Sequence, residues 1–104
     1  MIGEYIRSAS AKQFDWGAHD CSTFCADWRV LLGHADPMAD IRGKYHDEAS
    51  GLGLIYEGGG LLKLWADRMP EPDKNPIAGA VAVVSLRGEE LMSLYSGDRW
   101  IFLM

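Results

Sequence analysis

The sequence is poor in cysteine, in positive charge and in long apolar runs. Its 104 residues include two cysteines, whereas small secreted domains held together by disulfides usually carry four, six or eight. Ten lysines and arginines stand against 15 aspartates and glutamates, a net charge of −5. This balance argues against nucleic acid or an anionic membrane as a partner, because both attract clustered basic side chains. No apolar run approaches the roughly 20 residues that span a bilayer, so we expect no membrane insertion.

What is present is typical of one globular domain, which we place at residues 1–104. Hydrophobic residues make up 48% of the chain and charged residues 24%, the balance of a folded protein. Cys21 and Cys25 lie four residues apart, so a bridge between them would close almost no loop and stabilise little. We therefore expect free thiols and synthesis in a reducing cytosol.

Apolar spacing predicts two helices in the first third of the chain. Residues 2–12 carry apolar side chains at helical spacing, and residues 21–32 follow the i, i+3, i+4, i+7 pattern without interruption. Asp20 is placed to cap the second helix, since its carboxylate can accept an N–H of the first turn. Gly33 suits the left-handed position that ends it.

Three further helices are expected before residue 70. An aspartate followed by a proline predicts a short helix over residues 36–43, with Met38 and Ile41 facing inward. Asp47 is placed to cap a longer helix that ends at a run of three glycines. A last helix follows over residues 61–69, because its leucines and tryptophan again recur at helical spacing.

The final part of the chain reads as a sheet. Prolines at positions 70, 72 and 76 predict an extended linker. The valine-rich segment 80–86 then predicts a buried strand, and residues 91–95 and 100–104 predict two more. Helices followed by an antiparallel meander indicate an α+β fold. Because an apolar strand at a chain end is an open sheet edge, residues 100–104 are a predicted contact surface.

Cys21 is the first candidate for chemistry, because it follows the predicted cap at the start of the best-defined helix. Unpaired N–H groups and the helix dipole at that position favour a thiolate, as a cysteine nucleophile requires. The same pattern places Cys21 on the buried face of the helix, where a structural thiol is inert. Spacing alone leaves both interpretations open.

A zinc site would be another use of the two thiols. Structural zinc pairs a C-x₂₋₄-C segment with H-x₃₋₅-H or with a second cysteine pair. Cys21 and Cys25 fit the first half of that pattern, and His19 and His34 do not supply the second half. We expect no metal and no cofactor.

The segment 14–24, F-D-W-G-A-H-D-C-S-T-F, resembles the opening of the NlpC-like branch of papain-fold cysteine hydrolases. More specifically, it is similar to a small phage and prophage family related to NlpC-type tail proteins, in which F-x-W-G-x-H-D-C begins the long helix. Weaker matches follow in order: G-x-x-D-P at 33–37, R-G-K-Y at 42–45, a glycine pair within 58–60 and the valine-rich strand at 81–84. The resemblance therefore covers nearly the whole chain.

This resemblance implies a papain-like arrangement, truncated here to three strands, with the nucleophile helix packed on an antiparallel sheet. In active members the cysteine attacks an amide of a peptidoglycan stem peptide. A histidine on the second sheet strand takes the proton, and a third polar residue orients that histidine. Cys21 matches the nucleophile position.

The sequence departs from the active pattern in the sheet. Active members have Gly-Asp at the start of the first strand, where this chain reads Gly79-Ala80, and the expected second strand carries no histidine. General base assistance is typically worth 10²–10⁴-fold in rate, so its loss predicts a non-catalytic descendant. His19, two residues before Cys21, is the candidate for a replacement base, and Asp20 is expected to act as the cap.

Four further residues are candidates for binding. The resemblance implies that Arg42 pairs with an acidic group and holds the loop after the long helix, and Tyr45 reads as an aromatic residue at the edge of the core. Tryptophan is enriched at interface hot spots. We therefore add Trp16 and Trp100 as expected anchors for a protein partner.

The sequence thus predicts a phage or prophage tail-associated protein with a degenerate NlpC-like fold that works by binding other tail proteins. Such a protein is made in the bacterial cytoplasm and reaches the virion tail on assembly. One alternative is an active cysteine amidase or peptidase that cleaves peptidoglycan stem peptides with Cys21 as nucleophile. A second is a small acidic phage-encoded inhibitor of a host protein.

Overall fold

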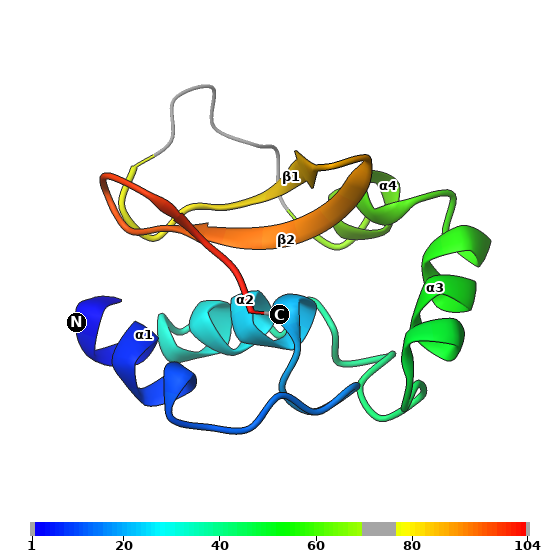
Figure 1. Ribbon diagram of the computed structural model, residues 1–104, viewed down its shortest axis with the longest axis horizontal. Coiled ribbons are helices and arrows are strands. Elements are labelled where there is room, and N and C mark those ends of the chain that lie inside the picture. Colours follow the sequence, from blue (N-terminus) through cyan, green and yellow to red (C-terminus); the bar gives the residue numbers. More distant parts are fainter. Residues whose placement is uncertain (1, 70–76, 104) are drawn as a thin grey trace.

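The helices occupy the first two thirds of the chain, as Figure 1 shows in this computed structural model, which describes residues 2–69 and 77–103. They are α1 (Ile2–Ser10), α2 (Cys21–Leu31), α3 (Glu48–Glu57) and α4 (Leu61–Ala66). All four lie where the sequence predicts helices, although α1 and α4 end earlier than expected. The predicted proline linker at 70–76 lies outside the described residues.

The prediction of a short helix over residues 36–43 is wrong. The segment forms successive turns, in which most backbone hydrogen bonds run from a residue to the third one before it. The Asp36 carboxylate accepts the Met38 N–H at 2.9 Å, which stabilises a turn as readily as a helix start. A segment this short also gains too few hydrogen bonds to offset the cost of nucleating a helix. The predicted inward orientation of Met38 and Ile41 is confirmed, since they are 2% and 9% exposed.

In the part of the chain that the structure describes, the sheet follows as three antiparallel strands in the order β1-β2-β3, so the predicted α+β class is confirmed. β1 (Val81–Leu86) and β2 (Glu89–Tyr95) are joined by Arg87 and Gly88, both at positive φ, as a two-residue hairpin turn requires. β3 (Trp100–Ile101) is much shorter than the predicted 100–104, and Met104 lies outside the described residues.

β1 corrects the expectation of a buried strand. It hydrogen-bonds to β2 along one edge, and its residues range from half-buried to exposed. Side chains of an edge strand have a neighbouring strand on one side only, which explains the partial exposure.

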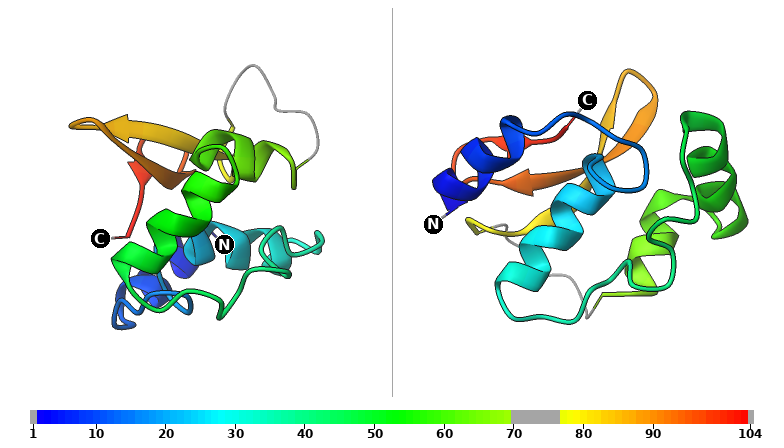
Figure 2. Two further views of the ribbon diagram at one scale, coloured as in Figure 1. Left: turned by 90° about the vertical axis from the view of Figure 1, so that its right-hand side faces the viewer. Right: turned by 90° about the horizontal axis from the view of Figure 1, so that it is seen from below.

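The core lies between α2 and β2. Phe24 and Trp28 of α2 are buried, as are Met92 and Leu94 of β2, and Figures 1 and 2 show α2 running beneath the sheet. The Trp28 ring N–H donates to the Gly79 carbonyl at 2.9 Å, which fixes the start of the sheet to the helix. Helix α2 is thereby held against the sheet, while α3 stands at the rim of the molecule (Figure 2).

Candidate functional site

The chain reaches α2 through a loop that is closed at its base and has a glycine at its tip. The Asp15 and His19 backbones exchange hydrogen bonds of 2.9 and 2.7 Å. Gly17 lies between them at φ +83, and a Cβ there would stand 2.2 Å from the Tyr45 carbonyl oxygen. Only glycine combines this backbone angle with such a close approach of a second chain segment.

The Asp20 carboxylate is the centre of this loop and is 1% exposed. One oxygen accepts the Thr23 N–H at 2.9 Å, and the Thr23 hydroxyl accepts the Asp20 N–H at 2.7 Å, which together form a capping box. The other oxygen accepts the Gly17 N–H at 2.9 Å and the Tyr45 hydroxyl at 2.6 Å. The predicted cap at Asp20 is confirmed, and it also joins the loop, the helix and residue 45.

Cys21 follows as the first residue of α2, half-buried and with a free thiol. Burial raises the pKa of this thiol above its ordinary value. A hydrogen bond with the Met92 backbone and others with Ser22 work against that rise in pKa, while the neighbouring Asp20 charge adds to it. The thiol is therefore protonated at neutral pH, because the influence of the helix start is outweighed by desolvation.

His19, His34 and His46 all lie outside β2, the strand on which the resemblance expects the base. The predicted replacement base, His19, is buried, and its Nε2 lies 2.9 Å from the Ala9 carbonyl oxygen in a hydrogen bond. His34 and His46 are exposed. The structure thus uses His19 to hold the loop against α1.

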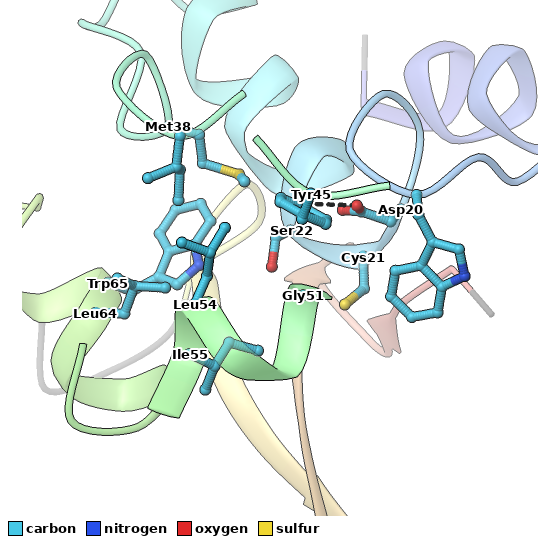
Figure 3. Close-up of a pocket in the computed structure, with 12 residues that line it drawn as sticks. Asp20, Cys21, Ser22, Met38, Tyr45, Gly51, Leu54, Ile55, Leu64 and Trp65 are labelled. Atoms are coloured by element: carbon cyan, nitrogen blue, oxygen red, sulfur yellow. Dashed lines mark hydrogen bonds between the residues drawn. The ribbon is translucent and has the colours of Figure 1, made fainter. Parts of the chain in front are cut away.

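A small cavity of about 50 Å³ opens beside Cys21. Figure 3 shows the Cys21 sulfur at one end of the cavity and Trp65 and Leu54 at the other. A volume of this size holds a few water molecules. Most of its wall is apolar and comes from the turn before α3 and from α3 and α4: Met38, Ile41, Tyr45, Leu54, Ile55, Leu64 and Trp65, with Trp16 at the loop.

Arg42 and Tyr45 are placed as tethers. The Arg42 guanidinium lies 2.7 Å from an Asp27 oxygen and 2.6 Å from an Asp36 oxygen. Arg42 therefore pairs with two aspartates, as the expectation of an acidic partner requires. The pair with Asp27 fastens the turn at residues 36–43 to α2, and the pair with Asp36 closes the turn itself. Burial and the bond to Asp20 raise the pKa of Tyr45 well above its ordinary value, so its hydroxyl stays a donor.

The two tryptophans predicted as anchors are each 37% exposed. Trp16 packs edge-on against Phe14, with ring centroids 5.0 Å apart, at the mouth of the cavity. Trp100, on β3, packs against Tyr95 with the rings tilted by 41° and their centroids 4.8 Å apart. The structure therefore brings Trp16 together with Cys21, Asp20 and Tyr45, and it places Trp100 elsewhere.

The described residues contain neither a candidate metal site nor a candidate membrane-spanning helix. In the stretches 2–69 and 77–103, no three histidine, cysteine or acidic side chains gather in a way that could hold a metal ion. Among the helices of those same stretches, none combines the length and the apolar character needed to cross a membrane.

Sequence reasoning missed the contacts that close the site. The Tyr45 hydroxyl bonds to a carboxylate 25 residues earlier, and the Tyr45 carbonyl abuts Gly17. The wall formed by α3 and α4 was also missed. No periodicity signals such contacts, because they depend on how separate elements are placed in space.

The chain matches one family of proteins over its whole length. The family model, described as a domain of unknown function (DUF6950), covers residues 1–104. Curated proteins and solved structures give no match to the chain. A family match over every residue shows membership, and the chain therefore belongs to the DUF6950 family.

Proposed function

We propose that the chain is a phage or prophage tail-associated protein with a degenerate NlpC-like fold, and that it works by binding other tail proteins. The proposal combines the F-x-W-G-x-H-D-C resemblance around Cys21 with the surroundings of that thiol. The observation that carries it is that β2 contains no histidine and that His19 is hydrogen-bonded to the Ala9 carbonyl, so neither supplies the base that a catalytic cysteine needs.

The resemblance expects a histidine on the second sheet strand, and the middle of β2, which packs on α2, carries Met92 instead. A methionine cannot take a proton from a thiol. His19 is engaged with the Ala9 carbonyl, so it gives no substitute in this arrangement. Without a base, a thiol with a raised pKa is a poor nucleophile at neutral pH.

The cavity beside Cys21 also supports a non-catalytic role. Peptidoglycan stem peptides are polar and extended, and they need a cleft with hydrogen-bonding groups. The walls here are mainly the apolar side chains of Leu54, Ile55 and Trp65, around a volume of about 50 Å³. Such a wall supports packing within the fold or against an apolar partner group.

The exposed aromatic residues support binding to protein. Trp16 and Trp100 lie on different parts of the surface, and rigid aromatic side chains are common interface anchors. Within the described residues β3 is an edge strand of only two residues, Trp100 and Ile101, and Leu103 packs against the core instead of extending that edge. Trp100 is thus the better contact to test, since Trp100→Ala leaves Ile101 and Leu103 in place.

The catalytic question is tested on the purified chain with the variants Cys25→Ala and Cys21→Ala. We expect iodoacetamide to alkylate Cys21 in Cys25→Ala with an apparent pKa above the ordinary value of about 8.5. We also expect the wild type and Cys21→Ala to release equal amounts of dye from labelled peptidoglycan. Release that depends on Cys21 would establish the amidase instead.

The association with tails is tested on particles of the phage or prophage that encodes the chain. We expect quantitative mass spectrometry of purified tails to find the chain at a fixed ratio to the other tail proteins. Trp100→Ala should lower that ratio, whereas Leu31→Ala, an exposed residue at the end of α2, should not. Tails that lack the wild-type chain would refute the association.

A further inference from the structure

Helix α3 is apolar on two opposite faces, and the described chain covers one of them. Gly51, Leu54 and Ile55 face the cavity and the core. On the other side Leu52 is 56% exposed and Tyr56 is 86% exposed. Residues four apart are neighbours on a helix surface, so these two side chains form one continuous patch.

Ala49 and Gly53 complete this patch, and both are exposed. We call these four residues, Ala49, Leu52, Gly53 and Tyr56, the outer face of α3. At about 100° per residue they fill one sector of the helix, opposite the buried sector. Figures 1 and 2 show α3 at the rim of the molecule, with no other element of the described chain beyond it.

Single exposed apolar side chains are ordinary on a protein surface, but a continuous apolar patch rimmed by charged residues marks a site of contact. The small residues strengthen this point. A Cβ added at Gly53 would meet nothing within 4 Å, so the backbone there is open to close approach. Small residues on a helix face let a second helix approach to about 8 Å between axes.

The charges around the outer face indicate what kind of helix would cover it. Glu48 and Glu57 lie on its two sides, and Asp47 precedes it. From residue 45 to residue 62 the sequence contains no lysine or arginine. A second copy of the chain would bring the same acidic groups, so pairing of two such faces is opposed by repulsion.

We propose that the outer face of α3 binds an amphipathic helix of another protein, whose apolar side covers Leu52 and Tyr56. Lysine or arginine residues beside that apolar side would face Glu48 and Glu57. This inference rests on the proposed function, because it names the chemistry of one binding partner. The apolar patch would supply most of the affinity, and the charges would supply orientation and choice of partner.

The test uses the full chain and two labelled helical peptides of about 16 residues, long enough to be partly helical alone. Both carry leucines at positions i, i+3, i+4 and i+7. One carries lysines beside that face, and the other carries glutamates in their place. Fluorescence anisotropy should detect binding of the lysine peptide and not of the glutamate peptide.

The variants separate docking from general charge attraction. Tyr56→Glu should weaken binding of the lysine peptide about tenfold or more, although it makes the protein more acidic. Leu86→Glu adds the same charge at a residue that is 42% exposed on β1, and it should not weaken binding. Gly53→Leu should also weaken binding, and its higher helix propensity excludes loss of α3 as the cause.

Three results would overturn the inference. They are equal binding by wild type and Tyr56→Glu, binding of both peptides alike, and self-association in sedimentation that Tyr56→Glu abolishes. The last result would mean that a second copy covers the face. Dye release from peptidoglycan that depends on Cys21 would overturn the proposed function while leaving peptide docking intact, so the two failures are distinguishable.

Discussion

Helices α2 and α3 begin with the same local motif in two different surroundings. Asp20 with Thr23 and Asp47 with Ser50 each form a reciprocal capping box, with the cap backbone extended in both. The Asp20 residue is 1% exposed, whereas the Asp47 side chain is 55% exposed. The motif therefore starts a helix in either place, and its surroundings decide whether the aspartate also binds other segments of the chain.

The difference lies in the second carboxylate oxygen. In Asp47 the oxygen outside the box meets His46 at 3.7 Å, a contact between two exposed side chains. In Asp20 it accepts the Gly17 N–H and the Tyr45 hydroxyl. One cap thus joins three chain segments beside Cys21, and the other serves its own helix, which presents its outer face to solvent.

The largest expected effect comes from removing each cap. Asp20→Ala leaves the Gly17 N–H, the Thr23 N–H and the Tyr45 hydroxyl buried without their acceptor, and each loss costs about 1–3 kcal/mol. We expect the free energy of unfolding in urea to fall by about 4 kcal/mol. Asp47→Ala should cost much less, because the exposed N–H of its cap can bond to water instead. Similar losses for the two variants would contradict the comparison.

The next effect tests the glycine at the tip of the α2 loop. Gly17→Ala combines a positive φ with a contact of 2.2 Å to the Tyr45 carbonyl oxygen, so a backbone segment must move. We expect it to lower the free energy of unfolding by about 3 kcal/mol. Gly43→Ala is the matched control, because φ is +75 there and nothing lies within 4 Å of the added Cβ. Gly43→Ala should lower the free energy of unfolding by about 1 kcal/mol. If Gly17→Ala cost no more than that, the backbone around Gly17 and Tyr45 would be able to move aside for the added Cβ.

These two cases also show what could be predicted from the sequence. The limits of α2 and both caps depend on residues within one helical turn, and their prediction is confirmed. The partners of the second Asp20 oxygen could not be predicted, since Tyr45 is 25 residues away and reaches it only after the turns at 36–43 have formed.

The errors have physical reasons of the same kind. An aspartate followed by proline starts helices and turns alike, so residues 36–43 were assigned to the wrong class. The apolar residues 102–103 suit a strand, but they leave β3 and line a hollow beside α1 with His19. At residues 102–103 the local preference was overruled by packing against an element that the pattern does not reveal.

A smaller effect isolates the Tyr45 hydroxyl. Tyr45→Phe removes one donor to Asp20 and leaves the buried ring in place. We expect a loss of about 1.5 kcal/mol, typical of a hydrogen bond to a charged group. Tyr56→Phe alters a side chain that is 86% exposed and should change stability by less than about 0.5 kcal/mol. If Tyr45→Phe changed the free energy of unfolding as little as Tyr56→Phe, the hydrogen bond from Tyr45 to Asp20 would contribute nothing to stability.

The smallest effect concerns the exposed cap alone. The Ser50 N–H and the Ser50 hydroxyl hold the pKa of Asp47 below its ordinary value. Because the folded-state pKa is below the unfolded-state value of about 3.9, the contribution of this cap is fully present above that pH. It is lost as the pH falls through the folded-state pKa.

The Ser50 amide reports this loss directly. We expect its NMR shift to titrate with a midpoint below 3.9 and its hydrogen exchange to quicken as α3 frays from its first turn. Asp47→Asn keeps an acceptor at the cap without a titrating charge, so it should remove the pH dependence and keep the helix. A midpoint at or above 3.9 in the wild type would mean that Asp47 is not held by Ser50. The capping box of α3 would then be weaker than its geometry indicates, and the difference in strength between the Asp47 cap and the Asp20 cap would be greater.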